Sequence, residues 1–359
     1  MPAIHIKYPP LRIRAGSHAR MLLQQQGLQP AMVACLPGAA GGPKAIGLCG
    51  LDQAVFGWLA ENPRPRELVG ASIGSWRFAC AMQANPQQAL ARLAERYTAE
   101  CYADNVSIAG ITAQTRLMLQ DILGSDGLQA ILRHPHYRLS LLLVASHGLL
   151  RHETPGHLLP GLAISAVLNT AKRSLLRHSF SRIICHDVRS SLHFVPDDGL
   201  PTHTVPLDQG NLTAALMGSV AIPGVLHGVS LPGAAPGVYR DGGLLDYHLD
   251  LPFARQDDIT LYPHFGPRIV PGWFDKFLPW RQHQPSHHSN TLLLCPAADY
   301  LARLPGGKLP DRSDFKRHRG NDRLRQQQWR TARSESQRLG DAWLEWLARG
   351  CPLNMVEPL

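Results

Sequence analysis

The clearest structural signal in the chain is the stretch ELVGASIG, residues 67–74. Its first half is apolar and predicts a buried strand, and a helix is expected from about residue 74. Between them Ser72 stands in the pattern G-x-S-x-G, which is typical of a serine on a strained strand-to-helix turn where larger neighbours would collide. The helix start would direct N–H groups and its positive dipole end at the reaction centre. We therefore predict that Ser72 is a nucleophile, with a plain glycine-rich turn as the structural alternative.

A second glycine-rich turn precedes this one. Residues 31–36 (AMVACL) predict another buried strand, and PGAAGGPK follows at 37–44. The phosphate-binding G-x-x-x-x-G-K pattern fails here because Ala45 follows Lys44, and G-x-G-x-x-G is absent. What remains is a strand–loop–helix with unobstructed backbone donors at Gly41 and Gly42. Such donors can stabilise an oxyanion, although an ordinary turn would look the same in sequence.

Around these turns, strand-like and helix-like segments alternate. Further strands are expected at 139–145, 191–195, 202–206, 258–262 and 291–295, and helices at 43–60, 86–101, 107–123, 157–178 and 211–219. This alternation predicts an α/β protein in which helices pack on a largely parallel sheet.

Two later stretches complete a set of motifs. Asp241-Gly242-Gly243 comes 169 residues after Ser72, and LMGSVAIP at 216–223 lies upstream of it. With the two glycine-rich turns, in this order, these residues resemble the patatin-like phospholipase family over about 30–255. The resemblance implies a three-layer α/β/α sandwich with a mostly parallel central sheet, and a serine acyl hydrolase that cleaves esters of phospholipids or related lipids.

The resemblance also assigns roles to residues. It implies a dyad of Ser72 as nucleophile and Asp241 as base, an oxyanion hole at Gly41 and Gly42, and substrate contacts from Lys44, Gly242 and Gly243. The chain departs from the family pattern at Ala40, Lys44 and Ala45, where the family has Gly, Arg and Gly. An acyltransferase on the same dyad, a triad that uses His248 or His227, and a non-catalytic lipid- or nucleic-acid-binding protein are the alternatives.

The motifs divide the chain into three parts. We expect an irregular lead-in at 1–30, the patatin-like domain at 31–255, and a C-terminal extension at 256–359 that ends in a long charged helix over 313–349. The seven cysteines are scattered without a C-x-x-C pair, which argues against a disulfide framework and a zinc site. We therefore expect no metal and no cofactor. No signal peptide or spanning segment is evident, so a cytoplasmic protein, peripheral at a membrane, is expected.

The charge of the chain bears on its partners. Lys and Arg outnumber Asp and Glu by 36 to 27, which suits a phosphate-bearing partner. Lys172, Arg173 and Arg177 predict a contact with anionic lipid at the end of the 157–178 segment, which would act as a lid or an interfacial helix unless it is an ordinary surface helix. The Trp-rich stretch 273–280 is a second candidate for a membrane contact. We do not expect nucleic acid to bind at 312–338, because acidic residues are interleaved with the basic ones.

Overall fold

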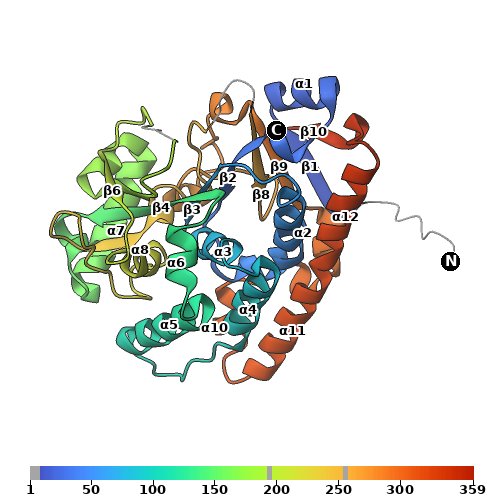
Figure 1. Cartoon of the computed structure of the whole chain (residues 1–359). Helices are drawn as coiled ribbons and strands as arrows, with labels where there is room; N and C mark the ends of the chain where they lie inside the picture. The colour runs from blue at the N-terminus through green and yellow to red at the C-terminus, as the bar shows by residue number, and fades with distance from the viewer. Residues whose placement is uncertain (1–8, 192–195, 254–257) are drawn as a thin grey trace.

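Strands alternate with helices along the chain, and the strands form one large mixed sheet (Figure 1). The structure is a computed structural model and describes residues 9–191, 196–253 and 258–359. Within these ranges the strand order is β10-β1-β9-β8-β2-β3-β4-β5-β6, and β7 pairs with β4. The strands are β1 (Leu11–Ala15), β2 (Val33–Gly38), β3 (Arg66–Ala71), β4 (Tyr137–Ser146), β5 (Phe180–His186), β6 (Thr202–Pro206), β7 (Tyr239–Asp241), β8 (Ile259–Pro263), β9 (Thr291–Pro296) and β10 (Val356–Pro358).

The centre of the sheet is parallel. Strands β9, β8, β2, β3 and β4 are neighbours that all run in the same direction. Antiparallel pairing occurs between β1 and β9, and between β4 and both β5 and β7. The predicted class, a mixed α/β protein with a mostly parallel central sheet, is confirmed.

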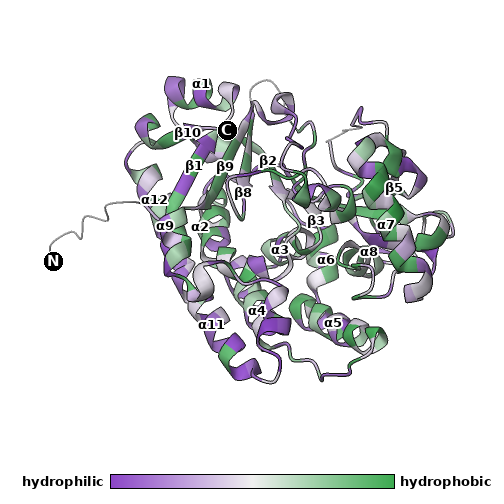
Figure 2. Cartoon of the chain, turned by 180° about the vertical axis from the view of Figure 1, so that it is seen from behind, coloured by the Kyte–Doolittle hydropathy of each residue, from purple (hydrophilic) through white to green (hydrophobic). Residues whose placement is uncertain are grey.

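The helices lie around this sheet. Seen from behind, α11 and α12 are at one end of the molecule and α7 and α8 at the other (Figure 2). The helices are α1 (Ser17–Gln26), α2 (Cys49–Leu59), α3 (Ile73–Ala81), α4 (Pro86–Ala99), α5 (Ile108–Leu123), α6 (Gly127–Leu132), α7 (Pro155–Ala171), α8 (Leu212–Ser219), α9 (Ala298–Arg303), α10 (Ser313–Arg317), α11 (Asp322–Glu335) and α12 (Gln337–Ala348).

Successive strand residues face two different cores, as the pleat of a strand requires. Leu68 and Leu141 belong to the main core, which α2, α3 and α4 cover. Val69 and Leu142 belong to the core on the opposite face, where the segment Tyr247–Phe253 covers the sheet together with Val270. Both faces of the central strands are therefore buried, which explains why these strands are apolar throughout.

The N-terminal segment is ordered where an irregular lead-in was expected. Strand β1 pairs with β9 and with β10, and α1 buries Ala19, Leu22 and Leu23. The alternation in LRIRA, with Leu11, Ile13 and Ala15 buried, is the signal for β1. Its partners lie more than 270 residues away in the chain, so nothing in the neighbouring sequence indicated that this short alternation would pair.

The C-terminal part, expected as a helical extension, contributes β8, β9 and β10 to the sheet. Strand β8 pairs directly with β2 at the centre of the sheet, and β9 and β10 follow on the same side. The change in composition after residue 255 marks the loops between these strands, while the strands themselves are short, buried and apolar.

The expected long charged helix is broken into α10, α11 and α12. Gly320 has a φ of +76° before α11, and the side chain of Asn321 accepts a hydrogen bond from Leu324 N at the helix start. Between α11 and α12, the Ser336 hydroxyl donates to Arg333 O and accepts from Gly50 N. The contact with α2 thus fixes the point at which the second break occurs.

Other expected elements have clear outcomes. The 157–178 segment is α7 followed by a 3₁₀ helix, η4 (Arg173–His178). The strand expected at 191–195 falls almost entirely outside the described residues.

Six of the seven cysteines are buried, and only Cys101 is exposed. None of the helices in the described ranges combines the length and apolar character that crossing a bilayer requires.

A buried ion pair links α2 to α3 and offers a test of the fold. Arg77 donates to both carboxylate oxygens of Asp52, with Nε 2.7 Å from Oδ2, and both side chains are almost fully buried. Arg77→Met should lower the free energy of unfolding by about 3–5 kcal/mol, because it leaves a buried carboxylate without its partner. The matched control is Arg96→Met at the exposed Arg96–Asp121 pair, which should cost ~1 kcal/mol or less. Equal midpoint shifts in urea denaturation would contradict this reading.

Candidate active site

Ser72 occupies the turn between β3 and α3. Its φ of +54° lies in the left-handed region, which a non-glycine residue adopts only when the surroundings enforce it. A Cβ atom on Gly70 would stand 2.6 Å from the Ser75 backbone, and one on Gly74 would stand 1.9 Å from Gly38 O. Both glycines of the motif are therefore required by close packing, as the sequence predicted. The strand–serine–helix arrangement is present.

The sheet register brings Asp241 to this serine. Strand β3 pairs along one edge of β4 up to the pair Ala71–Leu142, and β7 takes over the same edge at the pair Asp241–Leu143. Ser72, the next residue after β3, thus meets the end of β7. Ser72 Oγ donates a hydrogen bond to Asp241 Oδ2 over 2.6 Å, and the other oxygen, Oδ1, accepts from Gly243 N at 2.7 Å.

The surroundings of Asp241 suit a base. The residue is only 4 % exposed, and burial raises the pKa of its carboxyl group to about 6. The hydrogen bonds from Ser72 and Gly243 and the positive charges of Arg312 and Lys276 act in the opposite direction. The carboxylate is therefore more basic than an exposed aspartate but remains ionised at neutral pH.

Gly41 and Gly42 lie beside this pair, in the loop after β2, the parallel neighbour of β3. Gly42 has a φ of +56°, and a Cβ on Gly41 would stand 2.5 Å from the Phe265 ring. Among the described residues, neither backbone N–H donates a hydrogen bond to the protein. Two donors without protein acceptors beside a nucleophile are what an oxyanion hole requires.

The glycine loop rests on a supported aromatic ring. Phe265 lies under Gly41, and the guanidinium of Arg77 is 5.7 Å from its ring centre, with the Lys44 ammonium at 5.8 Å. Arg77 is held in turn by Asp52. The buried ion pair of the fold thus also supports the ring beneath the candidate oxyanion hole.

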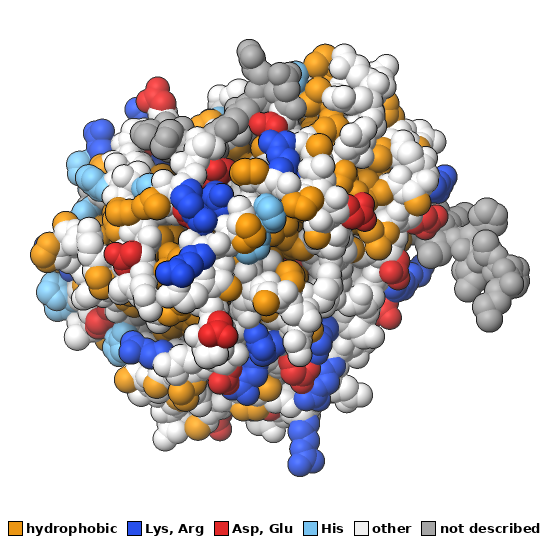
Figure 3. Space-filling model, in the orientation of Figure 1, with side chains coloured by type: hydrophobic (Ala, Val, Ile, Leu, Met, Phe, Trp, Pro, Cys, Tyr) orange, Lys and Arg blue, Asp and Glu red, His pale blue; other side chains and the backbone are white. Residues whose placement is uncertain are grey.

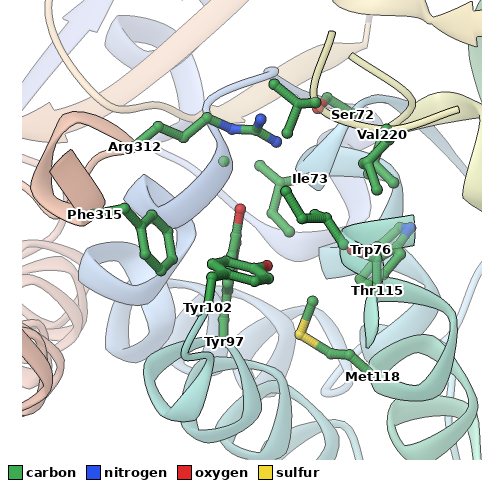
Figure 4. A pocket seen from close by; sticks show the side chains of 14 residues that line it. Ser72, Ile73, Trp76, Tyr97, Tyr102, Thr115, Met118, Val220, Arg312 and Phe315 are labelled. Atoms are coloured by element: carbon green, nitrogen blue, oxygen red, sulfur yellow. The ribbon is translucent and has the colours of Figure 1, made fainter. Parts of the chain in front are cut away.

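Two cavities meet at Ser72, and both are lined by Gly42, Ser72, Val225 and Arg312. The first, which we call the apolar cavity, has a volume of about 240 Å³. Figure 4 shows Arg312 and Ser72 at one end of it and Met118 at the other, with Tyr97 and Tyr102 between. The remaining lining includes Ile73, Trp76, Ile111, Thr115, Val220, Leu226 and Phe315.

The second, which we call the basic cavity, has a volume of about 390 Å³. Its lining combines Gly41, Asp241 and Gly243 with three cations, Lys44, Lys276 and Arg312, and one further acid, Asp311. Burial and the nearby Lys44 charge lower the pKa of Lys276 to about 8. Cations gathered at this density favour an anionic ligand group.

The three residues predicted to contact substrate, Lys44, Gly242 and Gly243, have different surroundings. Lys44 and Gly243 line the basic cavity, whereas Gly242 packs against the sheet, where a Cβ would stand 2.1 Å from Leu142 O. Gly243 also orients the Asp241 carboxylate through its N–H. The small-residue stretch 216–223 supports the site: Ala221 O accepts from Asp241 N, and Leu216 O accepts from the Trp76 indole.

The two histidines considered for a triad lie elsewhere. His248 Nδ1 accepts a hydrogen bond from Val270 N, and burial lowers the pKa of this ring well below its usual range. His227 pairs with Glu153. Within the described ranges neither ring is hydrogen-bonded to Ser72 or Asp241.

Several site residues come from the part of the chain beyond the resemblance. Lys276, Arg312 and Phe315 all line the cavities, and none lies in a motif. The Lys276 ammonium lies 3.9 Å from the ring centre of Tyr247, so it is held by an aromatic face as well as by charge. In sequence, only the density of aromatic residues around 273–280 pointed to this region.

No protein-family model matches the chain, and no curated protein matches it. The interpretation of the site therefore rests on its own residues.

The pKa of Asp241 gives a direct test of the dyad. The rate at which a fluorophosphonate labels Ser72 should rise with pH through about 6 and then level off, because only the ionised carboxylate accepts the serine proton. Lys276→Met should move this midpoint upward, since it removes a positive charge that favours the ionised form. Lys172→Met, at an exposed lysine, is the control. If labelling of the Asp241→Asn variant shows the same midpoint, the titrating group is not Asp241.

Proposed function

We propose that this protein is a serine acyl hydrolase of the patatin-like type, which cleaves acyl esters of phospholipids or related lipids. The observation that carries the proposal is the 2.6 Å hydrogen bond from Ser72 Oγ to Asp241 Oδ2, at a left-handed turn between two cavities. A hydrogen bond between an exposed serine and an exposed aspartate would not support a catalytic role. Here the serine is strained, the carboxylate is buried and basic, and two amides lie ready beside them.

The first chemical step follows from these contacts. Asp241 Oδ2 takes the proton of Ser72 Oγ as the oxygen attacks the ester carbonyl carbon, so that a C–O bond forms and the carbonyl oxygen becomes an oxyanion. Gly41 N–H and Gly42 N–H stabilise that charge, a contribution often worth ~3–4 kcal/mol for a single donor. Collapse of the intermediate expels the alcohol, which leaves with the proton from Asp241.

In the second step, water takes the place of Ser72 as the nucleophile. The product of the first step is an acyl ester of Ser72. Asp241 takes a proton from water, the hydroxyl oxygen attacks the acyl carbon, and the same amides hold the second oxyanion. Ser72 Oγ leaves and recovers the proton, and the fatty acid is released. Gly243 N–H holds Oδ1 throughout, which keeps Oδ2 directed at the serine.

The two cavities suggest where the two parts of a lipid ester bind. The apolar cavity accommodates an acyl chain, because most of its lining is hydrocarbon or aromatic. The basic cavity accommodates an anionic leaving group such as a phosphate-bearing alcohol, because Lys44, Lys276 and Arg312 face it. A phospholipid or lysophospholipid offers both parts on either side of one ester bond.

The first test removes each dyad member. Ser72→Ala should abolish fluorophosphonate labelling and lower p-nitrophenyl ester hydrolysis by about 10³-fold or more. Asp241→Asn should lower kcat by about 10²-fold or more, given what a positioned base supplies. His248→Ala and His227→Ala are the controls and should change kcat little. A folded Ser72→Ala protein with wild-type activity would refute the proposal, and a large loss in a histidine variant with Asp241→Asn active would favour a triad.

The same assay separates hydrolysis from transfer. With glycerol added as acceptor, a hydrolase releases free fatty acid as its main product, whereas an acyltransferase forms the new ester. Predominant ester formation in water containing glycerol would establish the acyltransferase alternative on the same dyad.

The apolar cavity predicts a chain-length effect. Met118→Trp fills its far end and should lower kcat/KM for dodecanoyl esters by about tenfold or more, while acetyl ester hydrolysis stays within about twofold. The neighbouring residue Leu117 is 59 % exposed, so Leu117→Trp is the matched control and should alter neither. An equal loss on both esters in Met118→Trp would place the acyl chain elsewhere.

A further inference from the structure

Helix α7 exposes several large apolar residues to solvent, while small and polar residues make up most of its buried face. The buried positions are Leu158, Gly161, Ser165 and Asn169, spaced along one face. Leu159, Ile164 and Val167 lie on the opposite face and are 65 %, 51 % and 70 % exposed. A helix that packs on a soluble domain normally shows the reverse arrangement.

Polar side chains on the inward face of α7 bind neighbouring segments and hold the helix in one orientation. Ser165 Oγ is 2.8 Å from both Gly161 O and Ser179 Oγ. Asn169 Nδ2 donates to Asp275 Oδ1 at 2.7 Å. A Cβ on Gly161 would stand 2.9 Å from the Leu150 side chain. These contacts fix which face of the helix points outward.

A second exposed apolar segment adjoins this face. The 3₁₀ helix η6 (Trp273–Phe277) packs against α7, and Asp275 within it receives the hydrogen bond from Asn169. Phe277 is 81 % exposed and Trp280, just beyond, is 64 % exposed. Figure 3 shows exposed hydrophobic, histidine and basic side chains, with some acidic ones, at the end of the molecule where Figure 1 places α7.

This surface continues into the active site. Leu162 of α7 and Trp273 of η6 both line the basic cavity that holds Ser72. Both exposed apolar segments therefore also contribute to the wall of that cavity. Because α7 and η6 are in contact, we treat their exposed residues and the one just beyond η6 as one surface comprising Leu159, Ile164, Val167, Phe277 and Trp280. We call it the α7–η6 face.

The two chain segments that build the α7–η6 face contain few acidic residues. The sequence contains no Asp or Glu from 154 to 186, and from 259 to 298 its single acid is Asp275, which is buried. Lys172 and Arg177 are exposed at the end of α7. Arg173, which the sequence grouped with them, is instead bound to Leu245 O and Asp275 and does not take part.

We propose that the α7–η6 face inserts into the surface of an anionic lipid membrane and opens the active site toward it, an inference that rests on the proposed lipid substrate. Apolar side chains would enter the boundary between headgroups and acyl chains while the flanking cations contact phosphates. An ester drawn from the membrane then has a direct path past Leu162 and Trp273 to Ser72.

The test uses the full chain with Ser72→Ala, so that the lipid is not consumed. This protein should co-sediment with vesicles of phosphatidylcholine and phosphatidylglycerol in equal parts. Adding Val167→Glu and Phe277→Glu should weaken that binding by about tenfold or more, because each introduces a negative charge at the lipid-facing surface. Leu117→Glu with Leu344→Glu, at exposed apolar positions on other helices, is the matched control and should bind as the parent does.

Activity separates the two proposals. With Ser72 restored, Val167→Glu/Phe277→Glu should hydrolyse a soluble short-chain ester at the parent rate and a vesicle-borne ester about tenfold or more slowly. Vesicle binding that the double variant leaves unchanged, or absent in the parent, overturns the membrane proposal while the hydrolase stands. A parent dimer that the double variant converts to a monomer, without vesicle binding by either, would assign the face to self-association. Vesicle binding without hydrolysis of any ester would overturn the hydrolase alone.

Discussion

Helix α3 approaches strand β2 so closely that only glycine fits at the contact. A Cβ on Gly74 would stand 1.9 Å from Gly38 O and one on Gly38 would stand 2.6 Å from the Phe78 ring. This contact holds the start of α3 against the end of β2 and forces the chain through a left-handed turn at Ser72. The serine, the glycine loop after β2 and the cavities around them all take their positions from it.

Opposing electrostatic effects set the pKa of Asp241. Burial alone would hold Asp241 protonated over a wider range, whereas Lys276, Arg312 and two hydrogen bonds favour its ionised form. Lys276 and Arg312 therefore have two effects: they lower the pKa of Asp241, and they make the basic cavity positively charged. Since Lys276 has a pKa of about 8, part of this influence fades in mildly alkaline solution.

The sequence predicted the features that depend on backbone geometry. Glycines at 70 and 74 mark a turn that no other residue can make, and apolar runs mark strands buried on both faces. These signals pointed to Ser72, whereas the roles expected of Asp241, Gly41 and Gly42 came from the family resemblance. Lys276, Arg312 and Phe315 were missed because a side chain that reaches a cavity through a long-range fold leaves no periodic signal. The inverted polarity of α7 was missed for a related reason: its residues are apolar or small all round, so only their burial distinguishes the faces.

The position of β8 has a consequence for synthesis of the chain. This strand lies between β2 and β9, although about 220 residues separate β8 from β2. While the ribosome is still making this region, one edge of β2 has no partner, and the segment with Arg312 and Phe315 has yet to emerge. Ser72 and Asp241 are by then already translated, but the walls of both cavities are incomplete. Both cavities can therefore be completed only after residues 312–315 have been translated, later than Ser72 and Asp241 themselves.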